Sequence, residues 1–274
     1  MDDSQRDTVA WGRLTVAADQ LDDLESMRKA TESRLRSLTE PVEIRSAGII
    51  IDKGMAGTPE AHSLEAQLDA LKAAEKIAVR EIERAMAAHP LSDFVKSTMG
   101  VGAKTVARLL GAMGDPLYRF DPEKGEMVER TFSQLKSYCG CGNMAEQRRK
   151  KGVKSNWNAK ARMRIYNIVE PSIRHRCEAC REAGKQRGEG EGWLAPPSDC
   201  TCASDGYRYR VIFDEARGHY DSADTTDGHK MNMALQKVKK AFLKDLWLEA
   251  RRVHGGSDAQ TKGDPSHQPE EVTA

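Results

Sequence analysis

Residues 97–110 read Ser-Thr-Met-Gly-Val-Gly-Ala-Lys-Thr-Val-Ala-Arg-Leu-Leu. The pattern predicts a first helix, a tight Gly-Val-Gly turn, and a second helix whose Ala107 and Leu110 share one face. The two glycines allow the turn to reach positive φ, which residues with a Cβ rarely adopt. Val101 between them is expected to anchor the turn in the core. The stretch therefore predicts two helices joined by a short turn, in a mainly α fold.

The start of the second helix is predicted to attract a phosphate group. The backbone N–H groups of Gly102, Ala103 and Lys104 lack acceptors within the helix, and the helix dipole favours an anion there. Lys104 adds a full positive charge, and Gly100 and Arg108 complete the DNA-binding residues predicted in this segment. The arrangement resembles the helix-hairpin-helix motif, which contacts the DNA backbone and not the bases. The alternative is a helix–helix turn that binds no ligand.

Residues 1–90 carry two apolar stripes with the spacing of a helix, which predicts a long helical hairpin or coiled coil. Arg28 interrupts the first stripe and Glu75 the second. Either the two stripes pack against each other within one chain, or they join two copies of the chain in a homo-oligomer. The stripes consist of Leu14, Ala17, Leu21, Leu24, Thr31, Leu35 and Leu38, and of Leu64, Leu68, Leu71, Ala78, Ile82 and Ala85.

The remaining boundaries follow from local signals. Residues 42–57 are predicted to be a connector, after which Thr58 is a plausible N-cap and Pro59 suits the first turn of a helix. Near the end of the chain, a helix is predicted over residues 227–253. The polar residues 254–274 are predicted to be a disordered tail.

Composition narrows the class of protein. The chain has 274 residues, of which 39% are hydrophobic, 31% charged and 5% aromatic, a profile that favours a helical protein over a β-sandwich. No secretory signal is evident, and no segment approaches the roughly 20 apolar residues of a membrane helix. We therefore expect a cytoplasmic protein with no membrane partner.

Positive charge is concentrated in one segment although the formal net charge of the chain is only +1. Residues 146–187 hold thirteen Lys and Arg residues against four Glu residues, the expected pattern of a phosphate-binding surface. The alternative is a solvated face. Trp157 and Tyr166 within it could stack on bases or simply pack. The DNA-binding residues predicted here are Arg148, Arg149, Lys150, Lys151, Lys154, Lys160, Arg162 and Arg164.

Four cysteines predict a structural metal site. They form two close pairs, Cys177 with Cys180 and Cys200 with Cys202, in a Cys-rich insertion at about residues 175–206. Four thiolates can surround one tetrahedral Zn²⁺ and leave no open position for catalysis. His175 is a substitute ligand, and reduced, loosely placed thiols are the alternative. The other two cysteines, Cys139 and Cys141, are expected to be small buried residues.

The order of these segments resembles the C-terminal half of the transposases of the insertion-sequence 110/116/902 family. The resemblance rests on residues 99–116, 132–140, 154–168 and 230–252, and spans about residues 93–252. It implies a helix-hairpin-helix DNA-binding domain over residues 91–253. It also implies the activity of a recombinase that cuts and rejoins DNA under the guidance of a structured RNA.

Two family features have no counterpart here. Residues 1–90 do not resemble the acidic nuclease domain of the family. Residues 143–152, where the family has its Ser-Gly nucleophile, contain no serine, and the serine nearest to this stretch is Ser155. The sequence thus predicts a nucleoid-associated DNA-binding protein, related to mobile-element transposases, that does not cut double-stranded DNA on its own. The first alternative is an active recombinase that uses Ser155 or a separate nuclease partner. The second is a coiled-coil interaction scaffold.

Overall fold

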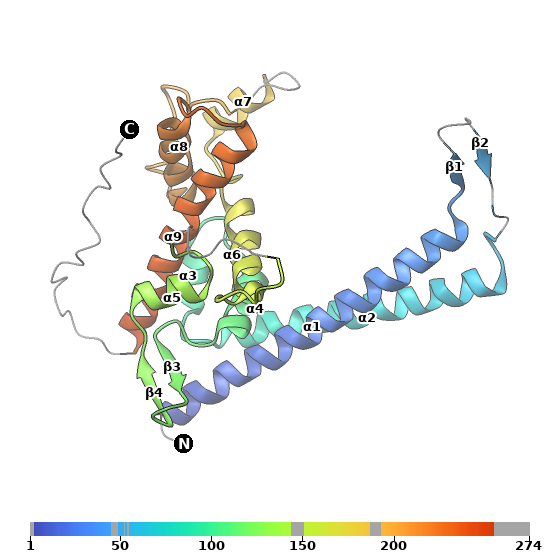
Figure 1. The fold of residues 1–274 in the computed structure, drawn as a ribbon, viewed down its shortest axis with the longest axis horizontal. Coiled ribbons are helices and arrows are strands. Elements are labelled where there is room, and N and C mark those ends of the chain that lie inside the picture. Colours follow the sequence, from blue (N-terminus) through green and yellow to red (C-terminus); the bar gives the residue numbers. More distant parts are fainter. Residues whose placement is uncertain are drawn as a thin grey trace.

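The computed structural model describes residues 3–44, 49–51, 53, 55–143, 151–186 and 193–254. The fold is mainly helical, as predicted. An arm built from α1 (Asp3–Thr39) and α2 (Pro59–Ala87) extends from a helical body (Figure 1). None of the described helices has the length and apolar character needed to cross a membrane.

Short helices and one long helix make up the body. In chain order these are α3 (Ser92–Ser97), α4 (Ala103–Met113), α5 (Phe132–Tyr138), α6 (Ala159–Ser172), α7 (Glu178–Lys185), α8 (Arg208–Tyr220) and α9 (Asp227–Val253). A β-hairpin of β3 (Tyr118–Asp121) and β4 (Glu126–Glu129) lies between α4 and α5. One continuous core joins α1, α2, α4, α6, α8 and α9. The first half of α1 therefore belongs to the same core as the body.

Side-chain caps mark where several helices begin. Thr58 accepts a hydrogen bond from the backbone N–H of Ala61, and Pro59 occupies the first turn of α2, as predicted. Thr131 and Gln134 form a reciprocal capping box at α5. Thr226 caps α9 in the same way as Thr58 caps α2. Each cap satisfies backbone donors that the helix itself leaves unpaired.

In the arm, α1 and α2 pack against each other within one chain. Leu21, Thr31 and Leu68, one or more from each predicted stripe, are buried. The two residues that interrupt the stripes form an ion pair with each other. Arg28 Nε donates a hydrogen bond to Glu75 Oε2 at 2.5 Å. The tip of the arm differs from the predicted connector. There β1 (Val42–Ile44) pairs with β2 (Ile49–Ile51) in an antiparallel ribbon.

The crossing of α1 and α4 depends on a glycine. A Cβ at Gly111 would lie 2.8 Å from the Ala18 Cβ and 2.9 Å from the Leu14 carbonyl oxygen. These separations are shorter than van der Waals contact, so any side chain would push the helices apart. Thr15 donates a hydrogen bond to the Gly111 carbonyl at the same crossing. Gly111 thus allows the arm to join the body closely.

Candidate nucleic-acid interface and metal centre

The Gly100–Gly102 turn joins α3 to α4 and lies against the end of α6. Gly100 has φ of +77°, and a Cβ there would lie 2.8 Å from His175 Cδ2 and 3.1 Å from Ser172 Cα. Two independent features therefore require glycine at position 100: the backbone conformation and the close packing. The turn thus connects two helices, α3 and α4.

The N-terminus of α4 has no side-chain cap among the described residues. Gly102 occupies the N-cap position, and its carbonyl accepts from the backbone N–H of Val106. The first-turn amides can therefore donate to an external acceptor. Lys104 is half-buried, and its charge contributes to lowering the pKa of Glu25 on α1. An anion at this turn would therefore lie near both a cation and an acidic side chain.

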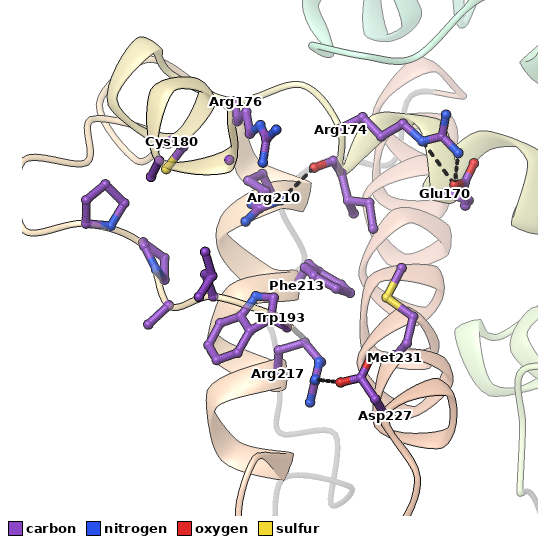
Figure 2. A pocket seen from close by; sticks show the side chains of 17 residues that line it. Glu170, Arg174, Arg176, Cys180, Trp193, Arg210, Phe213, Arg217, Asp227 and Met231 are labelled. Atoms are coloured by element: carbon purple, nitrogen blue, oxygen red, sulfur yellow. Dashed lines mark hydrogen bonds and ion pairs between the residues drawn. The ribbon is translucent and has the colours of Figure 1, made fainter. Parts of the chain in front are cut away.

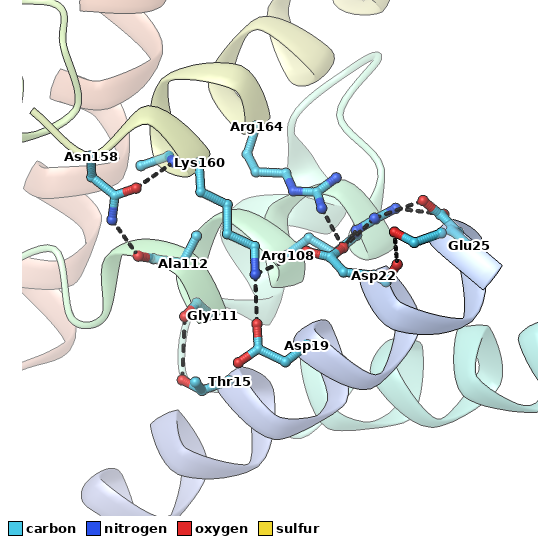
Figure 3. A network of polar contacts seen from close by, with 12 residues as sticks. Thr15, Asp19, Asp22, Glu25, Arg108, Gly111, Ala112, Asn158, Lys160 and Arg164 are labelled. Carbon is cyan, nitrogen blue, oxygen red and sulfur yellow. Dashed lines mark hydrogen bonds and ion pairs between the residues drawn. The ribbon is translucent and has the colours of Figure 1, made fainter. Parts of the chain in front are cut away.

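Two of the predicted DNA-binding arginines are buried. Arg108 and Arg164 both pair with Asp22 of α1, and Arg108 also donates to both carboxylate oxygens of Glu25, at 2.7 and 2.8 Å (Figure 3). Lys160 is half-exposed and lies 2.6 Å from Asp19 and 3.0 Å from Asp22. These cations therefore attach α1 to α4 and α6, and we leave them out of the interface.

The three cations strongly lower the pKa of the Asp22 carboxylate. Burial alone would raise its pKa, but hydrogen bonds from Lys160, Arg108 and Arg164 lower the pKa to about 2. The pKa of Glu25 is also lowered, because the hydrogen bonds and charge of Arg108 outweigh burial. Both groups thus stay ionised at neutral pH. Their charges neutralise the buried arginines within the chain.

The other predicted cations fall into two groups. Lys151 and Lys154 are exposed on the loop before α6, and the Arg162 guanidinium lies 5.1 Å from the centre of the Trp157 ring. Arg148, Arg149 and Lys150 lie outside the described residues. Packing is thus one role of Trp157, because Arg162 covers its ring.

A basic cluster forms where α5, α6 and α9 meet, and it consists of Lys136, Arg162, Lys239 and Lys240. All four charges act on the buried thiol of Cys141, whose pKa burial raises and these cations lower. Within the described chain, no carboxylate pairs with Lys136, Arg162 or Lys239. Only Arg162 was predicted from the sequence. The other three come from helices outside the basic segment.

Lys239 is the most unusual member of the basic cluster. Its residue is 6% exposed, and its Nζ lies 5.0 Å from the centre of the Tyr166 ring. Burial and the charge of Arg162 lower its pKa. Lys239 follows Leu235 and precedes Leu243 at helical spacing, within the buried stripe of α9. A lysine inside an apolar stripe was the sequence signal that could have identified it.

A second glycine turn holds Arg162 in position. Gly140 has φ of +68°, and a Cβ there would lie 2.8 Å from both Arg162 Cδ and Trp157 Cδ1. Asn158 closes this turn, because its backbone N–H donates to the Tyr138 carbonyl at 2.7 Å. The turn after α5 is thus packed directly beneath the first residues of α6.

Ser155 lies in the loop before α6, near Trp157. Its hydroxyl donates to the Trp157 carbonyl at 3.4 Å. In the described part of the chain, no carboxylate, imidazole or amine is hydrogen-bonded to this hydroxyl. A serine nucleophile needs an adjacent base, so its described surroundings do not activate Ser155.

The four cysteines of the insertion come together at the start of α7. The Sγ atoms of Cys177, Cys180, Cys200 and Cys202 all lie within 4.8 Å of one another. The Sγ–Sγ distances are 3.8 Å for Cys177–Cys200, 3.4 Å for Cys180–Cys200 and 3.8 Å for Cys180–Cys202. Four thiolates at 2.3 Å from a tetrahedral Zn²⁺ would be about 3.8 Å apart. The geometry is thus compatible with a metal site and too wide for disulfides.

The electrostatics of the cysteines also favour a bound cation. Although burial raises it, the pKa of Cys177 is lowered to about 6 by backbone hydrogen bonds from Cys180 and Thr201. Burial and the neighbouring thiols raise the pKa of Cys180, and that of Cys202 rises to about 11. A divalent cation would remove this mutual opposition to ionisation. His175 is not among the clustered ligands, because its ring packs against Gly100.

Cys139 and Cys141 are buried in the main core, as expected. Burial raises the pKa of Cys139 to about 12. Both thiols are therefore protonated at neutral pH. Cys139 contacts Met113, at an Sγ–Sδ distance of 3.9 Å, and acts as a small packing residue.

Comparisons with protein-family models, with curated proteins and with solved structures find no match to this chain. The basic cluster can bind a polyanion, and the uncapped start of α4 can donate to a phosphate oxygen. The cysteine site can stabilise the insertion but offers no open position for catalysis if all four thiolates bind one metal ion.

Proposed function

We propose that this protein binds duplex DNA through the phosphate backbone, with the basic cluster as its principal contact. The observation that carries the proposal is the convergence of Lys136, Arg162 and Lys239 from three helices, without a carboxylate partner among the described residues. Like charges repel, and burying a lysine costs free energy. A phosphate backbone would compensate for both effects, and neutralising it releases counterions from the DNA.

The α3–α4 turn is the second proposed contact. Gly102 leaves the first amides of α4 uncapped, and Lys104 stands in the same turn. Lys151 and Lys154 add exposed charge on the loop that leads to the basic cluster. Such contacts position DNA without reading its sequence.

We assign the protein to the DNA-holding part of a mobile-element recombination system, related to the insertion-sequence 110/116/902 transposases. The proposal does not include cleavage by this chain, since Ser155 has no activating base among the described residues. In this proposal, a separate nuclease would supply the chemistry. The clustered cysteines would hold a structural Zn²⁺ that stabilises the insertion.

The test is the affinity for a labelled duplex, measured by fluorescence anisotropy over a salt series. Lys136→Ala and Lys239→Met should each weaken binding and reduce the slope of log affinity against log salt by about 1. Lys76→Ala removes the same charge from an exposed site on α2 and is the matched control. Unchanged affinity and slope in both cluster variants would exclude the basic cluster as the DNA contact.

A structured RNA is the competing ligand. The two ligands are distinguished by a competition experiment at one salt concentration. An unlabelled RNA hairpin of equal length competes with the labelled duplex for the protein. We expect the duplex to bind at least as tightly as the hairpin. Much tighter binding of the hairpin would reassign the basic cluster to RNA.

A further inference from the structure

A cavity of about 540 Å³ lies between the end of α6, α7, the segment 193–197, α8 and the start of α9. It is distinct from the basic cluster, none of whose residues line it. Its walls combine cations with apolar side chains (Figure 2). The described lining residues include four arginines, Arg174, Arg176, Arg210 and Arg217, and two carboxylates, Glu170 and Asp227. The excess of positive charge favours an anionic ligand.

Arg217 provides the strongest sign of a missing partner. Its residue is 1% exposed, and its Nη2 donates to Asp227. Among the described residues its Nε and Nη1 atoms have no hydrogen-bond partner, and Nη1 lies 3.9 Å from a carboxylate oxygen of Asp221. Leaving the N–H groups of a buried cation unpaired is costly. Both atoms are closed off from solvent, so a ligand oxygen would reach them as the side chains around Arg217 move aside.

Arg176 is a second cation without an ion pair among the described residues, at the other end of the cavity (Figure 2). Its guanidinium lies over Gly184 of α7, where a Cβ would be only 2.6 Å from its Nη2. Glycine at this position of the helix thus makes room for the arginine. By contrast, Arg174 is paired with Glu170, and Arg210 with Asp214.

The middle of the cavity is apolar and partly aromatic. Phe213 lies one turn after Arg210 and one turn before Arg217 on α8, so the two arginines are about 10 Å apart along the helix with Phe213 between them. Met231 faces the same space (Figure 2). Trp193 covers Arg217 at 5.3 Å and donates to Asp214 at 3.0 Å. A ligand that matches these walls has an apolar, planar part and two anionic groups.

We propose that this cavity binds a nucleoside bisphosphate, with the base against Phe213 and Met231 and the two phosphates directed towards Arg217 and Arg176. The same chemical unit occurs free in solution and as an unpaired nucleotide within a DNA strand, which has a phosphate on each side. The site does not depend on the basic cluster, so it stands or fails separately from binding to duplex DNA.

The test is titration calorimetry of the full chain with adenosine 3′,5′-bisphosphate. We expect saturable binding at one site per chain, no binding of adenosine, and weaker binding of inorganic phosphate. Arg176→Ala should lower the affinity for the bisphosphate by about tenfold or more, which is the usual effect of losing a charged hydrogen bond. Arg181→Ala removes the same charge from the outside of α7 and should have no effect. No binding to the folded wild-type chain, or equal weakening by both substitutions, would overturn the proposal.

Two further measurements complete the test. Arg217→Lys keeps the charge but loses the planar donors, so it should also weaken binding, with thermal unfolding recorded to confirm that the variant is folded. A duplex with one unpaired nucleotide then identifies the source of the ligand. Competition between this duplex and the free bisphosphate supports the strand as the source. Bisphosphate binding without such competition supports a free nucleotide.

Discussion

At Asp22, three cations from the body meet. Asp22→Asn would leave Arg108 and Arg164 buried beside a neutral side chain, although Glu25 still pairs with Arg108. Breaking a buried ion pair from one side typically costs 3–5 kcal/mol, so we expect unfolding in urea to show a loss of about 3 kcal/mol. Asp23→Asn is the control, because Asp23 is exposed. Equal stability of the two variants would contradict an attachment of α1 through Asp22.

His89 predicts a pH dependence of stability. Burial, with the charge of His254 as a smaller cause, lowers the pKa of His89 from 6.5 to about 4. The unfolded chain therefore binds a proton that the folded chain does not, between about pH 6.5 and 4. Stability is complete above that window and falls as the pH drops through it, by at most about 3 kcal/mol.

His89→Asn isolates this effect, since an amide oxygen can still accept from the backbone N–H of Leu91. Urea unfolding at several pH values between 4 and 7 should show a smaller pH dependence in this variant than in the wild type. His62→Asn alters an exposed histidine and should leave the dependence unchanged. The contribution of Asp22 is separate, because its lowered pKa affects stability only as the pH falls below about 4 towards 2.

Among the elements, α7 and the segment that follows depend on the cysteine site. The helix has eight residues, and Cys177, Cys180 and Cys202 form a small core of their own, separate from the main one. A helix this short is not stable alone in water. We expect purified protein to hold one zinc ion per chain. Removal by a chelator should raise hydrogen exchange in α7 and in residues 200–207.

Cys180→Ser should have the same effect as chelation, whereas Cys139→Ser, in the main core, should lower global stability without loss of metal. Metal content by mass spectrometry and exchange by peptide separate these outcomes. Full protection of α7 after complete removal of the metal would mean that packing alone holds this element.

The helices, strands and cysteine site also differ in how well the sequence predicted them. Periodicity predicted the long helices, because each repeats its apolar spacing over many turns. The strands at the tip of the arm have three residues each, too few for a pattern. The hairpin pattern placed Arg108 on a DNA surface and charge counting placed Arg164 there, since nothing local reveals an acidic partner more than 80 residues away. The cysteine cluster was predictable because the cysteines of each pair are close in sequence, and two such pairs are typical of a metal site.

For the whole molecule, the outer arm is expected to be separable from the body. The main core includes Leu14, Leu21, Ala78 and Ile82 but no buried residue between Leu21 and Ala78. The outer half of the arm projects away from the other helices (Figure 1). Replacing residues 32–71 by a short glycine-rich turn keeps the Arg28–Glu75 pair and should leave the body folded.

We expect this shortened chain to unfold within a few degrees of the full chain, because the contacts it loses lie within the arm. Its affinity for duplex DNA should be unchanged, since no residue of the basic cluster is removed. Sedimentation of both proteins then tests the role of the arm in self-association. A full chain that dimerises beside a monomeric shortened chain would assign the arm to pairing two copies. A large drop in melting temperature would instead show that the arm and the body unfold as one unit.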